Sequence, residues 1–159
     1  MPLYFAYGAN MDVTAMARRC PSSKPVGLAR LPRHRWIIST DGYANVVRDP
    51  RRDVHGMLWE LALSDVPVLD RFEDVPRLYH KVNQPVISTA GIRRALVYVG
   101  RATDIGRPRP GYLDDVMRAA EAAGLPAASL ADMRKFGEVR PGIAAPATAA
   151  KAQKWVWTP

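Results

Sequence analysis

Cysteine is almost absent from this sequence, since Cys20 is the one cysteine among 159 residues. A single cysteine excludes a disulfide within the chain and a cysteine-rich metal site. The three histidines, His34, His55 and His80, are scattered and do not have the spacing of metal ligands. We therefore expect no metal site.

Long apolar runs are also lacking. No stretch reaches the about 18 apolar residues that a membrane-spanning helix requires. The first residues, MPLYFAYGANMD, lack the basic segment and the long apolar stretch of a secretory signal. A composition of 48% hydrophobic and 24% charged residues is typical of a globular chain and excludes disorder as a whole. We expect a cytoplasmic protein without a membrane partner.

Acidic residues are in the minority, with 15 Asp and Glu against 23 Lys and Arg and a net charge of +8. Many of the arginines fall in pairs: Arg18/Arg19, Arg33/Arg35, Arg51/Arg52 and Arg93/Arg94. Clustered guanidinium groups can neutralise nucleic-acid phosphates. No RNA-binding aromatic motif, zinc-finger spacing or basic heptad helix accompanies them, which favours a solvated basic surface over a nucleic-acid partner. A positive field also attracts small anionic substrates.

The pattern of apolar residues predicts mostly short strands with helices between and after them. Strands are expected over residues 3–7, 26–31, 35–40, 43–48, 54–61, 79–87 and 92–99. Helices are expected over 13–19, 65–72, 112–123 and 127–136. Asn10 or Asp12 is placed to cap the first helix. Turns are expected at Asp41-Gly42 and over the polar residues 49–53, and a loop over 100–111. This order predicts an α+β fold with a curved sheet or small barrel.

Two segments are candidates for chemistry. Tyr7-Gly8-Ala9-Asn10 follows the first strand, and N–H groups at such a strand-to-helix turn can bind an anion or a carbonyl oxygen. The alternative is a simple turn. Glu73 is one of four glutamates and follows Phe72 at a helix end. Apolar surroundings disfavour the charged form of a carboxyl group and suit it to general acid/base work. The alternative is an exposed carboxylate paired with Arg71 or Arg77.

Three blocks of sequence resemble the γ-glutamylcyclotransferase-like superfamily, including its AIG2-like and γ-glutamylamine cyclotransferase members. Residues 4–11, YFAYGANM, resemble the strand-and-loop signature usually written YGSN. Residues 42–47, GYANVV, with 54–61, VHGMLWEL, resemble the next block. Residues 69–75, LDRFEDV, followed by Tyr79, resemble the segment that bears the catalytic glutamate. The order and spacing of the blocks match, and the resemblance covers roughly residues 3 to 100.

The resemblance implies a small mixed β-barrel with flanking α-helices, and we expect this domain over residues 1–140. Composition predicts an Ala/Pro-rich C-terminal tail over 141–159. It implies that Glu73 is the catalytic acid/base. It further implies that Tyr7, the loop Gly8-Ala9-Asn10 and Tyr79 form the substrate-binding site. The implied reaction is intramolecular cyclisation of a small γ-glutamyl substrate, which releases 5-oxoproline and a free amine or amino acid without a cofactor.

Two residues depart from the family pattern. Ala9 replaces the usual Ser, which removes a hydroxyl group but keeps the main-chain donors. Asp74 replaces the usual Gly and is expected to put a second carboxylate near Glu73, where it either disfavours ionisation further or helps to bind a cation. These departures motivate a second hypothesis, a non-catalytic small-molecule-binding module on the same barrel. The net charge motivates the third, nucleic-acid binding. The sequence does not indicate the oligomeric state.

Overall fold

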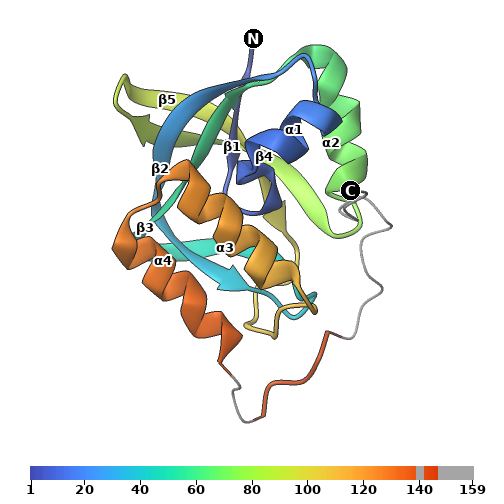
Figure 1. Ribbon diagram of the computed structural model, residues 1–159, viewed down its shortest axis with the longest axis vertical. Coiled ribbons are helices and arrows are strands. Elements are labelled where there is room, and N and C mark those ends of the chain that lie inside the picture. Colours follow the sequence, from blue (N-terminus) through green and yellow to red (C-terminus); the bar gives the residue numbers. More distant parts are fainter. Residues whose placement is uncertain (139–141, 147–159) are drawn as a thin grey trace.

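The computed structural model describes residues 1–138 and 142–146 and shows a closed barrel with strand order β1-β3-β2-β4-β5 (Figure 1). The strands are β1 (Leu3–Ala6), β2 (Lys24–Ile38), β3 (Ala44–Glu60), β4 (Tyr79–Ser88) and β5 (Gly91–Gly100). The β1–β5 pair, in which Tyr4 faces Leu96, is parallel, whereas β1–β3, β2–β3, β2–β4 and β4–β5 are antiparallel. The predicted α+β fold with a small mixed barrel is confirmed.

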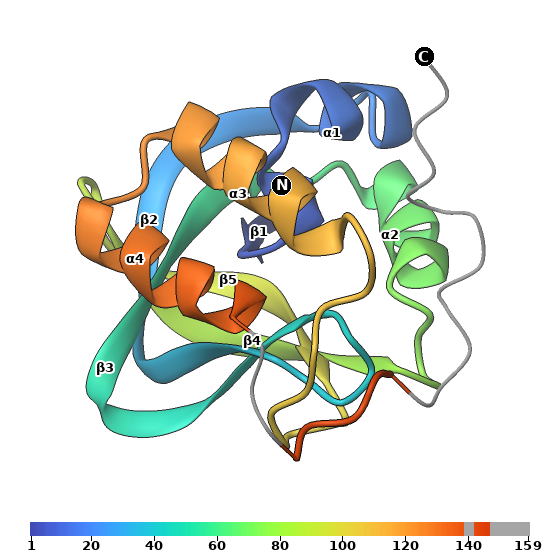
Figure 2. The same cartoon turned by 60° about the horizontal axis from the view of Figure 1, so that its bottom comes forward.

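Helices flank this barrel. They are α1 (Val13–Arg19), α2 (Val66–Phe72), α3 (Tyr112–Ala123) and α4 (Ala127–Arg134), with short 3-10 helices η1 (Ala9–Met11), η2 (Leu63–Asp65) and η3 (Lys135–Gly137). Helices α3 and α4 lie side by side against the outside of the barrel, and α1 and α2 are neighbours near one end of it (Figures 1 and 2). The four predicted helices are confirmed, although the last one ends as the 3-10 helix η3.

Local signals explain where the helices begin and end. Asp12 caps α1, because its Oδ1 accepts a hydrogen bond from the main-chain N–H of Ala15 at 2.8 Å. Of the two predicted caps, Asp12 and not Asn10 therefore serves this helix. Gly124 ends α3 in the left-handed conformation, with φ of +82°, which a glycine adopts without steric cost.

Two predictions about the strands are wrong. Strand β2 is continuous where two strands were expected, and the polar residues 49–53 lie within β3 where a turn was expected. Pro32 pairs with Asp53 and His34 pairs with Arg48, so residues 49–52 of β3 have only Arg33 opposite them. Arg33 has φ of +59°. The polar segment is thus an irregular bulge, with four residues opposite one, that interrupts the β2–β3 pairing without ending β3.

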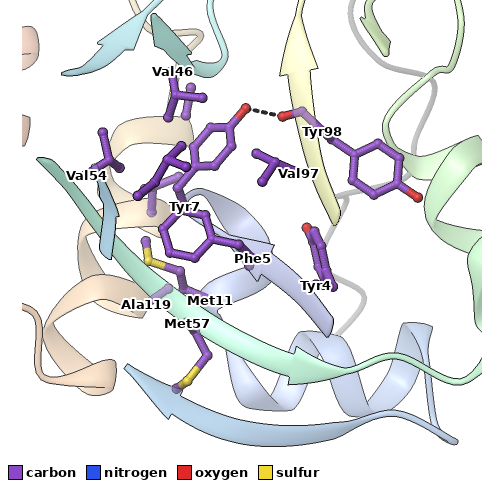
Figure 3. Close-up of a cluster of buried hydrophobic side chains, with 14 of the residues drawn as sticks. Tyr4, Phe5, Tyr7, Met11, Val46, Val54, Met57, Val97, Tyr98 and Ala119 are labelled. Atoms are coloured by element: carbon purple, nitrogen blue, oxygen red, sulfur yellow. Dashed lines mark hydrogen bonds between the residues drawn. The ribbon is translucent and has the colours of Figure 1, made fainter. Parts of the chain in front are cut away.

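Apolar side chains fill the inside of the barrel. All four residues of β1 are buried, as predicted for the first strand. Phe5, Val97 and Tyr7 pack together in this core, and the Tyr7 hydroxyl points at the main chain of β5 (Figure 3). It donates a hydrogen bond to the carbonyl oxygen of Tyr98 at 2.5 Å. The barrel core therefore includes a buried polar contact, and both of its residues line the pocket described below.

Some predictions are left open by the structure. Most of the predicted tail, residue 141 and residues 147–159, lies outside the described residues. No helix among the described residues is long and apolar enough to cross a membrane. Within residues 1–138 and 142–146, no group of three or more His, Cys, Asp or Glu side chains is arranged to hold a metal ion. The cytoplasmic location stays a prediction.

Candidate active site

A pocket lies where the end of β1, helix η1, the end of α2 and the start of α3 meet. Its empty volume, counted out to the open mouth, is about 440 Å³. Its lining consists of Tyr4, Phe5, Tyr7, Gly8, Ala9, Asn10, Tyr43, Ala44, Phe72, Glu73, Tyr79, Tyr98 and Tyr112. The six residues predicted from the sequence to form the site, Tyr7, Gly8, Ala9, Asn10, Glu73 and Tyr79, are all in this lining. Residues far apart in the sequence therefore meet at one pocket.

Glu73 is the carboxylate of the pocket wall. It follows the last residue of α2, and its main-chain N–H donates to the carbonyl of Leu69 at 2.8 Å, which continues the helical turn. The residue is only 8% exposed, so the alternative of an exposed helix-end carboxylate is wrong. The side-chain amide of Asn10 donates to Glu73 Oε1 at 3.4 Å. A buried carboxylate with a polar neighbour thus faces the pocket.

Asp74, the residue after Glu73, forms an ion pair with Arg77. Its carboxylate is held by Arg77, whose Nε donates to Asp74 Oδ2 at 3.0 Å. Asp74 also has φ of +55°, a left-handed conformation that is usual for a glycine. Asp74 thus binds Arg77, which was itself an expected partner of Glu73. The expected influence of the Asp74 carboxylate on Glu73 stays a prediction.

The segment Tyr7–Asn10 is held at both ends by indole groups. Trp36 Nε1 donates to the Tyr7 carbonyl at 2.9 Å, and Trp59 Nε1 donates to the Asn10 carbonyl at 3.1 Å. Between them, a Cβ on Gly8 would come within 3.3 Å of the Tyr112 hydroxyl, so the chain approaches this wall closely. The first N–H groups of a helical turn have no acceptor within the helix. Gly8, Ala9 and Asn10 of this turn line the pocket.

The tyrosine hydroxyls of the pocket are oriented by the main chain. Tyr79 donates to the carbonyl of Ala44 at 2.5 Å, as Tyr7 does to that of Tyr98. Burial raises the pKa of both Tyr7 and Tyr79 well above the ordinary value, and the nearby Glu73 raises it further. Both phenols thus keep their protons at neutral pH. Because a hydroxyl has one hydrogen, these two oxygens can offer only acceptor lone pairs to a ligand.

Sequence reasoning missed several residues of this site. Tyr112 begins α3, and its hydroxyl accepts a hydrogen bond from the N–H of Ala44 at 3.1 Å. It stands outside every motif, so no local signal indicates it. Tyr4 belongs to the YFAYGANM block, and its hydroxyl accepts from Asn10 Nδ2 at 3.0 Å. Its place in that block was the available signal for it, whereas strand alternation puts Tyr4 on the face opposite to Tyr7.

Comparison with known proteins identifies the class to which this fold and pocket belong. A family model described as "Gamma-glutamyl cyclotransferase, AIG2-like" matches residues 4–117. The chain belongs to this family. A search of curated protein sequences found no significant match.

Solved structures share the fold at low sequence identity. A structure titled "Gamma-glutamyl cyclotransferase" is 23% identical, with a TM-score of 0.74 over 96% of this chain and 95% of that one. An uncharacterized protein from Homo sapiens is 23% identical, with a TM-score of 0.76 over 94% and 91% of the two chains. An AIG2-like protein from Mus musculus is 18% identical, with a TM-score of 0.56 over 71% and 82%. The barrel and its flanking helices are therefore those of this family.

Proposed function

We propose that this protein is a γ-glutamylcyclotransferase, which converts a γ-glutamyl substrate into 5-oxoproline and a free amine or amino acid. The observation that supports this most strongly is the pocket itself. It combines one buried carboxylate, Glu73, with main-chain N–H groups of the Gly8–Asn10 turn. Family membership supports the reaction class. The substrate's own α-amine is the nucleophile, so the protein has to supply position and proton transfer only.

In the proposed reaction, the α-amine of the γ-glutamyl group attacks the γ-carbonyl carbon. Glu73 takes a proton from the α-ammonium group before the attack. A new C–N bond closes the five-membered ring, and the amide bond to the leaving group breaks. Glu73 then passes this proton to the leaving nitrogen. The attacking nitrogen loses a second proton as the lactam forms, and that proton ends on the released amine, which leaves as an ammonium ion, so protons balance over the cycle. No step uses a metal ion or a cofactor.

Two sets of groups bind the substrate in this proposal. The N–H groups of the Gly8-Ala9-Asn10 turn stabilise the oxyanion of the tetrahedral intermediate or hold the α-carboxylate. The hydroxyl oxygens of Tyr7 and Tyr79 accept hydrogen bonds from the α-ammonium group, because their own hydrogens are bound to main-chain carbonyls. Ala9 serves as well as a Ser for the first role, since the donor is main-chain.

The test is a mass-spectrometric assay for 5-oxoproline with a panel of γ-glutamyl peptides and γ-glutamyl amines. Glu73→Gln keeps the size and polarity of the side chain and is expected to lower turnover by about 100-fold or more, as loss of a general acid/base does. Asp74→Asn is the matched control, since its carboxylate binds Arg77, and is expected to keep its activity. Full turnover by Glu73→Gln would show that another group moves the proton. If the wild-type protein binds these compounds in calorimetry but forms no product, it is the non-catalytic binding module.

A further inference from the structure

Arg19 lies directly behind the wall of the pocket. It is the last residue of α1, and its guanidinium group lies over the ring of Phe72, 3.6 Å from the ring centroid. One of its nitrogens, Nη1, also donates a hydrogen bond to Oδ1 of Asn10. Asn10 and Phe72 both line the pocket, whereas Arg19 does not. Arg19 therefore contacts two residues of the pocket lining from outside the lining itself.

The contact with Arg19 decides which way the Asn10 amide faces. A guanidinium group can only donate hydrogen bonds, so the atom of Asn10 that meets it must be the oxygen. The NH₂ end then points to the other side, where it donates to the Tyr4 hydroxyl at 3.0 Å and to Glu73 Oε1 at 3.4 Å. Asn10 is only 2% exposed, so water is a poor substitute for these partners. The Asn10 amide thus has one orientation in which its oxygen and its NH₂ group both have hydrogen-bond partners.

The positive charge of Arg19 also acts on the Glu73 carboxylate. Burial lowers the pKa of its guanidinium group, while the nearby Tyr4 and Glu73 raise it, which shows that the arginine and the glutamate attract each other electrostatically. A guanidinium group stays charged at neutral pH. Arg19 therefore provides a fixed positive charge near the buried carboxylate of Glu73.

We infer that Arg19 is a positioning residue, which orients the amide of Asn10 so that its NH₂ group holds the Glu73 carboxylate in place for proton transfer. This inference rests on the proposed function for its kinetic consequence. In the absence of Arg19, the amide of Asn10 can turn by 180° and present its oxygen to the carboxylate, which repels it. The carboxylate then loses its fixed position. Misplacement of a reacting group by about 1 Å can cost about 100-fold in rate.

A double-mutant cycle tests whether Arg19 acts through Asn10. Arg19→Met, which keeps the length and apolar stem, is expected to lower kcat by about 10- to 100-fold. KM is expected to change much less than kcat. In an Asn10→Ala background, the same Arg19→Met change is expected to have little further effect, because the group it orients is gone. Arg19→Lys, which also only donates, should restore part of kcat. Fully additive effects in the cycle would overturn the inference.

The neighbouring Arg18→Met serves as the control for loss of one positive charge from α1. It is exposed on the same helix and is expected to keep the wild-type kcat. Circular dichroism and thermal melting check that each variant is folded. Where Arg19→Met does not fold, Arg19→Gln replaces it, since a glutamine can either donate or accept and no longer imposes one orientation on Asn10.

A second readout does not depend on turnover. The side-chain NH₂ resonances of Asn10, assigned by their loss in Asn10→Ala, are expected to show nuclear Overhauser contacts with Tyr4 in the wild-type protein. In Arg19→Met these contacts are expected to weaken or disappear. If they do so while the wild-type protein makes no 5-oxoproline, the proposed function fails but the positioning of Asn10 by Arg19 stands. If the contacts stay unchanged in Arg19→Met, the inference is wrong whatever the activity.

Discussion

Asn45 is expected to be the polar residue on which closure of the barrel depends most. It lies in β3, is fully buried, and bonds to the end of β5. Its Nδ2 donates to the carbonyls of Gly100 at 3.1 Å and Ala102 at 2.8 Å. Its Oδ1 accepts from the N–H groups of Val46 and Gly100, both at 2.8 Å. All four hydrogen-bonding positions of the amide are therefore used.

Asn45→Leu removes these four bonds and keeps the branching of the side chain at Cγ. A buried polar group that loses its partner costs about 1–3 kcal/mol, and four main-chain groups are affected. Taking about 1.5 kcal/mol for each gives a loss of about 6 kcal/mol. Burial of the leucine side chain offsets about 2 kcal/mol of this. The free energy of unfolding is thus expected to fall by about 4 kcal/mol, a large part of the about 5–15 kcal/mol typical of a domain.

Equilibrium unfolding in urea measures this change. With a slope of about 2 kcal/mol per molar urea, the loss corresponds to a shift of the midpoint by about 2 M. Asn45→Asp is the companion variant. It keeps the oxygen that accepts two hydrogen bonds but places a negative charge against two carbonyl oxygens. It is therefore expected to lower the free energy of unfolding at least as much. A shift below about 0.5 M for Asn45→Leu, with an unchanged slope, would refute the reasoning.

Three further predictions follow from single residues. In Gly8→Ala the new methyl group comes within 3.3 Å of the Tyr112 hydroxyl, so KM is expected to rise while the melting temperature changes little; an unchanged KM would contradict this crowding. Burial raises the pKa of the Cys20 thiol to about 11, so labelling by a disulfide reagent at pH 8 should be slow in the folded protein and fast in denaturant; equal rates would argue against it. Burial also lowers the pKa of His34, so the unfolded state binds more protons below about pH 6.5. The free energy of unfolding should therefore decrease as the pH falls from there, and His34→Gln should flatten that decrease in urea titrations at pH 5 to 7.

The sequence predicts the elements well where one local signal dominates. The hairpin of β4 and β5 follows from two alternating strands around a short polar turn, and α3 follows from an amphipathic helix ended by Gly124. The bulge in β3 was predicted as a turn because its local composition is that of a turn: Arg51 N–H bonds to Asp49 Oδ1, a local bond usual in turns. The strand continues because the residues on both sides of the bulge pair with β2. The local sequence pattern does not indicate that pairing.

The residues of the site also divide into those that a local sequence pattern indicates and those that only the folded structure brings together. The Tyr7–Asn10 turn and Glu73 were candidates from their residue types and positions, and the family resemblance joined them into one predicted site. Arg19 and Tyr112 were not found as site residues, since the first looks like one of many surface arginines and the second like the apolar start of a helix. Their contacts with the site depend on how α1 and α3 pack against the barrel. Such contacts follow from the fold as a whole and not from a local pattern.

Two consecutive residues of β3 connect the stability of the barrel with the geometry of the pocket. Ala44 contacts two of the pocket tyrosines, and Asn45 connects β3 to the end of β5. Ala44 binds these two tyrosines, since its carbonyl accepts from Tyr79 and its N–H donates to Tyr112. The next residue, Asn45, ties the same stretch of main chain to Gly100, where an added Cβ would come within 2.9 Å of the amide. Release of Asn45 therefore moves the peptide that holds Tyr79 and Tyr112. A substitution at Asn45 should lower turnover under conditions in which the protein is still folded, because it loosens the wall that faces Glu73.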